Sequence, residues 1–230
     1  MTATSPVLGA RFCEGKTKVL HVDPANAGMC IVHSKDDITA GDGAKHDTIP
    51  GKGAWATTTT CSVFRLLQAC GIPVAFDAQI DTTHFRAPIC QMLPYEVVVR
   101  REAHGSYLKR APHLAKGHVF PRLVLEFFLK TSGGEWKGHK LRCDDPFMVH
   151  DREKRHIDLY DPKLPNFIQN PAVPFLRIAE QEVFSRDDKA VLMQKMDKIA
   201  RRTFLVLERA WQIQGRRLVD FKVEFGIDRN

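Results

Sequence analysis

The residues of this chain best suited to chemistry lie near its C-terminus, at positions 218–226. Apolar and charged residues alternate there without a break, so Asp220, Lys222 and Glu224 are expected to share one face of a strand. Two carboxylates and an ammonium group in one row are able to hold a metal ion or a phosphate. The alternative is an edge strand whose charged face meets water and is balanced by ion pairs.

A second group of suitable residues occupies positions 14–18, Glu-Gly-Lys-Thr-Lys. This is not a P-loop, because position 10 is alanine where that motif needs glycine, and because a strand-like run follows where it needs a helix. A glycine turn entering a strand would put Lys16 and Lys18 on one face, about 7 Å apart, where they can straddle a triphosphate. A solvated hairpin tip is the alternative.

A polar, glycine-rich loop is expected from residue 35 to residue 53. The aspartates that begin at Asp36 do not have EF-hand spacing, which argues against a dedicated calcium loop. Gly41 and Gly43, on either side of Asp42, permit positive φ and a close approach of backbone N–H groups to a ligand. The loop is either a ligand-binding segment or a plain surface turn.

Residues 92–110 form a third candidate segment, in which Pro94 interrupts an apolar run. The stretch from Met92 resembles a linker between two lobes, whose backbone can meet the edge of an adenine. Arg100 is expected on a strand and points either to solvent or into a cleft. Ser106, which follows a glycine, offers a hydroxyl group and an N–H group to an anion.

Short strands and two helices are predicted to position these residues. Their segregation along the chain indicates an α+β fold rather than a doubly wound parallel sheet. Residues 131–174, rich in Gly, Pro, Asp, Lys and His, are expected to form an irregular surface excursion. Strands are predicted at residues 18–22, 29–33, 96–100, 123–129 and 218–226, and helices at residues 54–70 and 186–213.

Helical periodicity predicts the buried face of each helix. In the first helix it marks Ala54, Cys61, Phe64 and Leu67, and Gly71 with Pro73 ends the helix. In the second it marks Met193, Met196, Ala200, Phe204, Leu207 and Trp211. Ser185 with Asp188 forms a plausible cap at the start of the second helix, and Gly215 stops it.

Composition narrows the class of protein. A chain of 230 residues with 43% apolar and 27% charged residues can form one large domain or two small ones. No apolar run is long enough to cross a bilayer and the N-terminus lacks signal-peptide features, so a cytoplasmic protein without a membrane partner is expected. The six cysteines lack a C-x-x-C pair and the ten histidines lack metal-ligand spacing, which favours reduced thiols over a zinc site.

A formal net charge of +7 indicates anionic partners. Small phosphorylated substrates, nucleotides and nucleic acids all satisfy this condition. Acidic residues are interleaved with the basic pairs, and there is no long basic tract or aromatic-basic motif. The sequence therefore favours a small-molecule ligand over nucleic acid.

Taken together, six motifs resemble those of the phosphoribosylaminoimidazole-succinocarboxamide synthase (SAICAR synthetase) family. The resemblance extends from about residue 11 to residue 228, and residues 85–88 with 91–94 are similar to the animal-type branch. The motifs, in chain order, are E-G-K-T-K, K-D-D-I-T-A-G-D-G, G-K-G, M-L-P-Y-E-V-V-V-R, G-S-x-L-K-R and L-V-D-F-K-V-E-F-G.

The resemblance implies a ligase that uses ATP and magnesium. Such enzymes join L-aspartate to the carboxylate of carboxyaminoimidazole ribonucleotide through an acyl phosphate, and release SAICAR, ADP and phosphate. It also implies two α+β lobes with antiparallel sheets, related to ATP-grasp enzymes, with ATP in a cleft between them. In this chain the lobes would be residues 1–93 and 94–230, and a homo-oligomer is possible.

The resemblance also implies roles for individual residues. ATP would be bound by Lys16, Lys18, Met92, Lys222 and Glu224, with Glu224 as the magnesium ligand. The imidazole nucleotide would be bound by Arg100 and Ser106, and the substrate side of the cleft would be lined by Asp36, Gly41, Asp42 and Gly43. Catalysis would rest on Asp36, Lys222 and Glu224.

The resemblance has one departure. Family members continue beyond the terminal strand into another strand with a second acidic metal ligand and then into an arginine that grips substrate, whereas this chain ends at Asn230. The second lobe is therefore expected to be incomplete. Three interpretations stay open: a family ligase, an ATP-binding relative with a different acceptor, and a shortened, non-catalytic form that retains nucleotide affinity.

Overall fold

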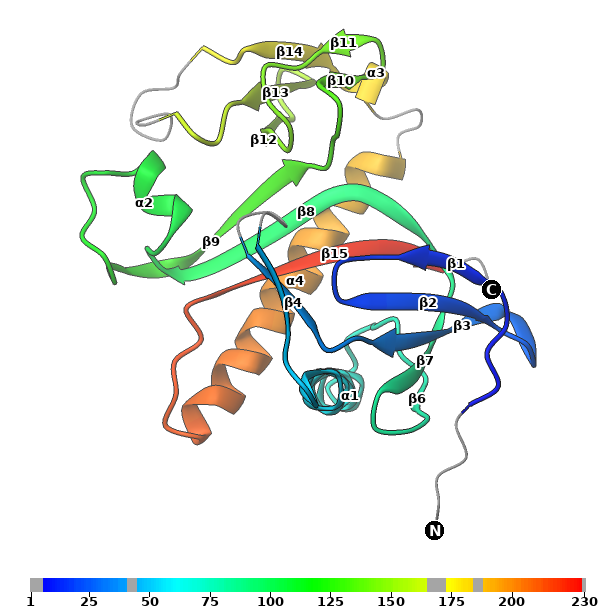
Figure 1. Cartoon of the computed structure of the whole chain (residues 1–230). Coiled ribbons are helices and arrows are strands. Elements are labelled where there is room, and N and C mark those ends of the chain that lie inside the picture. The colour runs from blue at the N-terminus through cyan, green and yellow to red at the C-terminus, as the bar shows by residue number, and fades with distance from the viewer. Residues whose placement is uncertain (1–5, 41–44, 165–172, 184–187, 229–230) are drawn as a thin grey trace. The chain divides into compact units, whose positions relative to one another are not determined.

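The computed structural model describes residues 6–40, 45–164, 173–183 and 188–228 (Figure 1). The chain divides into two compact units: unit 1 is Met1–Gln91 with Gly226–Asn230, and unit 2 is Met92–Phe225. The sequence had placed the boundary between residues 93 and 94 and had assigned residues 226–230 to the second lobe. Each strand pair with a defined register is antiparallel, so the mixed α/β class with antiparallel sheets is confirmed.

Unit 1 is built on a five-stranded sheet in the order β1-β2-β3-β7-β6. Helix α1 (Lys52–Ala69) packs on this sheet through Cys61, which joins a core with Cys30 and Phe85. The predicted strands at 18–22 and 29–33 and the predicted first helix are confirmed. The strands are β1 (Arg11–Glu14), β2 (Lys18–Asp23), β3 (Asn26–Ser34), β6 (Ala78–Gln79) and β7 (His84–Pro88).

The segment expected to be a loop contains a two-stranded sheet instead. β4 (Asp37–Ala40) pairs with β5 (Lys45–Thr48) in antiparallel register, so the prediction of a polar, glycine-rich loop from residue 35 to residue 53 was wrong there. β5 is polar throughout, and His46 contacts Asp37 across the pair at 2.5 Å. β4 alternates polar and apolar residues over only four positions, and its apolar residues Ile38 and Ala40 are exposed, so neither strand buries an apolar face.

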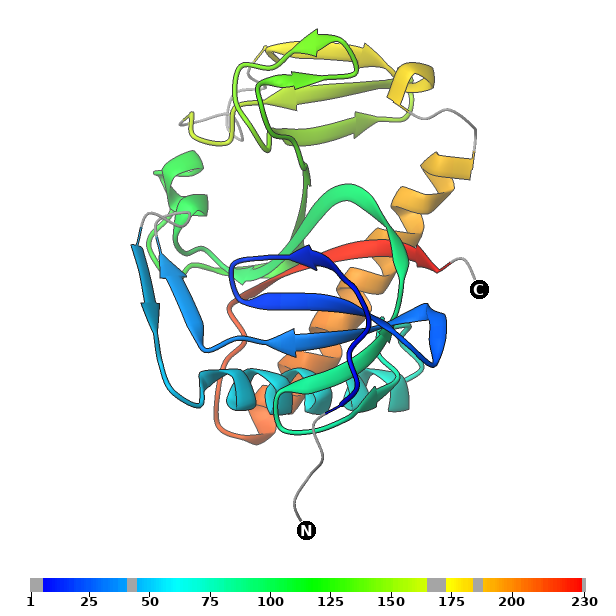
Figure 2. The same ribbon diagram turned by 45° about the vertical axis from the view of Figure 1, so that its right-hand side comes forward.

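Unit 2 is built on a six-stranded sheet in the order β14-β13-β12-β9-β8-β15. The long helix α4 (Asp188–Ile213) crosses one face of this sheet (Figure 2). Phe204 of the helix packs there against Val97 and Val99. The predicted strands at 96–100, 123–129 and 218–226 are confirmed, and β8 continues through Pro94. The strands are β8 (Cys90–Glu102), β9 (Val119–Leu129), β12 (Phe147–Asp151), β13 (His156–Tyr160), β14 (Leu176–Ala179) and β15 (Asp220–Asp228), and the short helices are α2 (Ser106–Arg110) and α3 (Glu180–Val183).

The prediction that residues 131–174 form an irregular excursion was wrong. They contain β12 and β13, two strands of the main sheet, and a small hairpin of β10 (Glu135–Trp136) and β11 (His139–Lys140). Ile157 and Leu159 of β13 are fully buried. His156 and Asp158 on the other face are also buried, so both faces of the strand are covered although its sequence alternates polar and apolar residues.

The predicted second helix is confirmed from Asp188 onward, and Gly215 follows its end with a φ of 65°. Met193, Met196, Ala200 and Phe204 are buried as predicted, whereas Trp211 is 44% exposed and does not belong to the buried stripe. Ser185 of the predicted cap lies outside the described residues. Among the helices that the structure describes, none combines the length and apolar character needed to span a membrane.

Candidate functional site

Strand β15 presents its charged residues on one face, as the alternation predicts. Phe221 and Val223 point to the core beside α4. On the opposite face, Lys222 contacts Glu96 with 2.8 Å between Nζ and Oε2. Because Asp220 contacts Arg100 four residues further along β8, the two strands run in opposite directions.

Glu224, the third member of the charged row, pairs with Lys130 just beyond the end of β9. The distance from Lys130 Nζ to Glu224 Oε1 is 3.1 Å. This hydrogen bond raises the pKa of Lys130. Each of the three charged residues of the row thus has an ion-pair partner of opposite charge. This pairing agrees with an edge strand whose charged face is balanced by ion pairs, and it does not decide whether the row binds a ligand.

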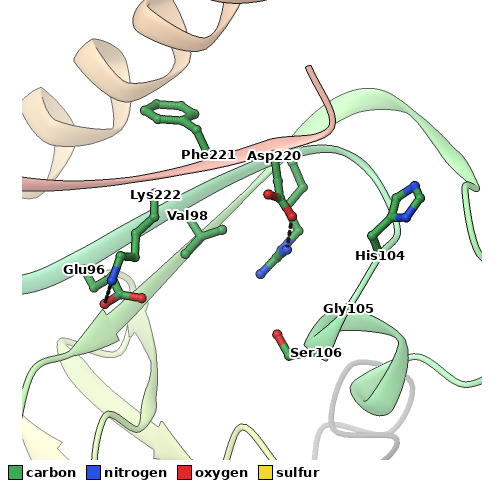
Figure 3. A pocket seen from close by; sticks show the side chains of 9 residues that line it. Glu96, Val98, His104, Gly105, Ser106, Asp220, Phe221 and Lys222 are labelled. Carbon is green, nitrogen blue, oxygen red and sulfur yellow. Dashed lines mark hydrogen bonds and ion pairs between the residues drawn. The ribbon is translucent and has the colours of Figure 1, made fainter. Parts of the chain in front are cut away.

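A hollow of about 330 Å³ opens on this charged face in unit 2 (Figure 3). It brings together Arg100, Ser106 and Lys222, three residues that the sequence singled out. Met92 and Glu224 are not among its lining residues. The lining consists of Glu96, Val98, Arg100, His104, Gly105, Ser106, Asp220, Phe221 and Lys222.

Backbone geometry at Gly105 sets the position of Ser106. Gly105 has a φ of 57°, which a residue with a side chain rarely adopts, and helix α2 begins at the next residue. His104, just before it, contacts the buried Glu102, with 3.1 Å between Nε2 and Oε2. Ser106 is therefore the first residue of a helix that follows directly after the Gly105 turn, and from this position it lines the hollow.

The Arg100 side chain is fixed from the buried side of the sheet. Its Nε donates to Glu126 Oε2 at 2.7 Å, and the other oxygen of Glu126 accepts from Arg110 Nη2 at 2.6 Å. The Tyr107 ring lies 5.5 Å from each of the two guanidinium carbons. At the open side, Arg100 Nη1 donates to Asp220 at 2.7 Å. The guanidinium group is thus held in one direction by three neighbours.

Four residues of this neighbourhood were not assigned a role from the sequence. Glu126 carried a usable signal, because a lone carboxylate inside the apolar run 123–129 needs a buried partner. Asp220 had been placed in the charged row that is able to hold a metal ion or a phosphate. The four are Glu96, His104, Arg110 and Glu126.

In unit 1, one of the two lysines predicted to share a strand face lies outside the strand. Lys16 is exposed in the turn between β1 and β2, so the prediction that it lies on the strand was wrong. The turn closes through a bond from the Gly15 N–H group to the Lys18 carbonyl. Lys18 begins β2 and is half-buried, with Nζ 5.9 Å from the centre of the Phe85 ring. Burial, and then the charge of Lys52, lower the pKa of Lys18.

Both carboxylate oxygens of Asp36 bind the start of helix α1. Oδ1 accepts from the Gly53 N–H group at 2.7 Å and Oδ2 from the Gly51 N–H group at 3.0 Å, and these bonds hold the pKa of Asp36 below its usual range. Gly51 has a φ of 81°, and a Cβ atom at Gly53 would lie 2.4 Å from the Ser34 carbonyl oxygen. The G-K-G motif therefore serves a close backbone contact. Gly41, Asp42 and Gly43 lie outside the described residues.

The described residues contain no group of three His, Cys, Asp or Glu side chains arranged to hold a metal ion. A magnesium ion bound to phosphates needs only one or two protein carboxylates. Glu224 offers one such carboxylate, with its side chain 35% exposed. These residues fit a metal ion that is coordinated mainly by phosphate oxygens of a bound nucleotide, and they do not fit a metal site coordinated by protein side chains alone.

Comparison with known proteins identifies the family. The profile of the SAICAR synthetase family matches residues 11–141 and 169–230. This chain belongs to the SAICAR synthetase family. Phosphoribosylaminoimidazole-succinocarboxamide synthase of Roseiflexus sp. (strain RS-1) is 36% identical over 221 residues, which cover 96% of this chain and 74% of that protein. The multifunctional protein ADE2 of Gallus gallus is 34% identical over 221 residues, covering 96% of this chain and 44% of that protein.

Solved SAICAR synthetase structures share the fold. A SAICAR synthetase (Type-2) in complex with ADP superimposes with a TM-score of 0.67 at 27% identity, covering 96% of this chain and 76% of that one. A second SAICAR synthetase superimposes with a TM-score of 0.64 at 26% identity, covering 94% and 76%. Every residue that lines the hollow falls within the matched ranges, whereas β12 and β13 fall in the unmatched stretch 142–168.

Proposed function

We propose that this SAICAR synthetase family member joins L-aspartate to the carboxylate of carboxyaminoimidazole ribonucleotide. ATP phosphorylates that carboxylate, the aspartate amine displaces phosphate from the acyl phosphate, and SAICAR, ADP and phosphate leave. The observation that carries the proposal is the family match, which includes all residues lining the hollow in unit 2. The family reaction belongs to purine biosynthesis, and its demands are alignment, charge neutralisation and exclusion of water.

The hollow supplies the groups that an anionic nucleotide needs. A guanidinium group recognises phosphate or carboxylate oxygens through two N–H groups in a plane, and Arg100 is held in one orientation there. Ser106 adds a hydroxyl group, and Lys222 adds a compact positive charge at the other end of the lining. We therefore assign Arg100 and Ser106 to the imidazole nucleotide.

The ATP contacts form a separate part of the proposal. In unit 1, Lys18 offers an ammonium group removed from water, where its attraction to phosphate is stronger than in bulk solvent. Lys16 in the neighbouring turn offers a second, exposed ammonium group. In unit 2, Lys222 is assigned to phosphate and Met92 to the adenine. The ADP complex of the Type-2 SAICAR synthetase supports nucleotide binding in this family.

Glu224 would hold magnesium, and the ion would supply positive charge to phosphate oxygens during transfer. Lys130 now occupies one oxygen of this carboxylate, so Lys130 has to share or release it. Asp36 is assigned a positioning role instead of the catalytic role expected from the sequence, because both its oxygens are bound to backbone N–H groups. The relationship to ATP-grasp enzymes and the cytoplasmic location remain predictions.

A stoichiometric assay tests the proposal. The purified chain is incubated with ATP, magnesium, L-aspartate and carboxyaminoimidazole ribonucleotide, and SAICAR, ADP and phosphate are quantified. Equal amounts of the three products are expected, with none formed when aspartate is omitted. ADP release that needs some other amine or carboxylate would indicate a different acceptor. Nucleotide binding without turnover would indicate a non-catalytic form, and either result would refute the proposal.

A further inference from the structure

Two guanidinium groups share a single carboxylate beneath the hollow. Arg100, Arg110 and Glu126 are 7%, 2% and 3% exposed, so all three charges are shielded from water. Burying charged groups is costly unless geometry and hydrogen bonds compensate. Glu126 compensates by placing one oxygen on each arginine, at 2.7 and 2.6 Å. Residues 123–129 around Glu126 are otherwise apolar, and hydrophobic side chains in place of all three charged residues would fill the same space at no greater cost.

The three residues divide into an inner pair and an outward-facing member. Arg110 lies under Tyr107 and against the Phe128 ring, whose centre is 5.5 Å from its guanidinium carbon, and it does not line the hollow. Arg100 does line it, and its Nη1 reaches the partly exposed Asp220. Glu126 thus reaches the wall of the site through Arg100, and Arg110 reaches it through its Nη1, which donates to the backbone carbonyl of Ser106 at 3.4 Å.

We propose that Glu126 and Arg110 are positioning residues that aim Arg100 at an anionic group of the imidazole nucleotide. Arg110 fixes one oxygen of Glu126, which directs the other oxygen to Arg100 Nε. A rotation of the Arg100 guanidinium group would break that bond, so its remaining N–H groups stay directed to the hollow. The inference rests on the proposed function for the identity of the ligand, and on the buried geometry for the role of the pair.

The test compares three variants with the unchanged chain. Glu126→Gln keeps the shape and removes the charge that joins the arginines. The double variant Glu126→Gln with Arg110→Gln removes one charge of each sign, which restores the charge balance if the single variant folds poorly. The matched control is Glu208→Gln, because Glu208 holds the neighbouring Arg101 through bonds of 2.7 and 3.1 Å and does not line the hollow.

The readout is the steady-state split between KM and kcat, with calorimetric affinity for carboxyaminoimidazole ribonucleotide as a second measurement. Both Glu126 variants are expected to raise KM and Kd for this nucleotide roughly ten- to a hundredfold, because a small misplacement of a binding group is costly. The KM for ATP and the kcat should change by less than about threefold, since uniform binding is what is lost. Glu208→Gln should leave all four quantities near their original values.

Several results would overturn the inference. One is an unchanged nucleotide affinity in the folded double variant, and another is an equal loss in the Glu208→Gln control. A chain that binds the nucleotide in a Glu126-dependent way and yet forms no SAICAR would refute the proposed function and support the positioning role. If the unchanged chain binds neither this nucleotide nor inorganic phosphate, the positioning role is refuted as well.

Discussion

Several charged side chains of this protein are committed to holding other groups in place. Asp36 binds two backbone N–H groups at the start of α1, and Glu126 binds two arginines under the hollow. Neither role follows from counting charges in the sequence, because each depends on partners 15 or more residues away. Arg100 and Ser106 were placed together correctly because they are close in the chain, on either side of one glycine turn.

Replacing Asp36 with asparagine should lower stability in a pH-dependent way. The folded pKa of Asp36 is lowered, so its contribution is present above the pKa of the unfolded chain and is lost as pH falls through the folded pKa. The thermal midpoint of Asp36→Asn should therefore lie below that of the unchanged chain at about pH 7 and approach it in strong acid. Asp47→Asn is the control, because among the described residues this β5 carboxylate is bonded to the N–H group of the next residue, Thr48. A constant difference at all pH values would contradict the assignment.

Replacing Lys18 with alanine should weaken ATP binding by tenfold or more, on the order of 1.4 kcal/mol or above. Burial lowers the pKa of Lys18, so this residue loses its charge at a lower pH than an ordinary lysine does. The ATP affinity of the unchanged chain should therefore begin to fall at that lower pH as the solution is made alkaline. Calorimetric titration across alkaline pH measures both effects. Lys18→Met keeps the packing on Phe85 and should lose the affinity as well. Retained affinity in both variants would remove Lys18 from the nucleotide site.

At the scale of elements, the strands that were predicted and those that were missed differ in what they bury. β8 and β15 place apolar side chains against α4, so their periodicity is visible in the sequence. β4 and β5 have no buried apolar face, whereas β13 buries Ile157 and Leu159 on one face and His156 and Asp158 on the other. Arg177 on β14 pairs with the buried Asp158 at 2.7 Å, and this partner is set by the fold.

The hairpin of β12 and β13 is expected to be part of the unit 2 core although the family match omits it. Ile157 is fully buried in a cluster with Leu159, Ile178 and Met193. Ile157→Ala should therefore cost about 2–5 kcal/mol of unfolding free energy, because it leaves a cavity. The matched control is Val149→Ala on the same hairpin, which is 38% exposed and should cost less than about 1 kcal/mol. Urea unfolding measures both, and equal costs would mean that the hairpin does not pack into the core.

At the scale of the whole molecule, the family match includes residues of both units. Each unit has its own buried residues: unit 1 has a cluster around Cys61 and Phe85, and unit 2 has one cluster around Ile157 and another around Phe204. The sequence identified the family through short motifs that lie near turns and strand ends. It did not identify the buried charges beneath them, because a motif records residue types and the partners are set by the fold.

The net charge of +7 is expected to act on the rate of encounter with anionic ligands and not on nucleic acid binding. Raising salt from about 50 to about 200 mM should lower kcat/KM for the imidazole nucleotide severalfold and leave kcat nearly unchanged, because screening weakens steering. Replacing Lys195 and Lys198, exposed on α4, with glutamine removes two charges that do not line the hollow. That variant should keep most of the affinity at high salt, where distant charges are screened.

Single-stranded RNA should not compete with the nucleotide under the same conditions. Tight RNA binding with a steep salt dependence would instead show that the positive charge is organised into a nucleic acid surface.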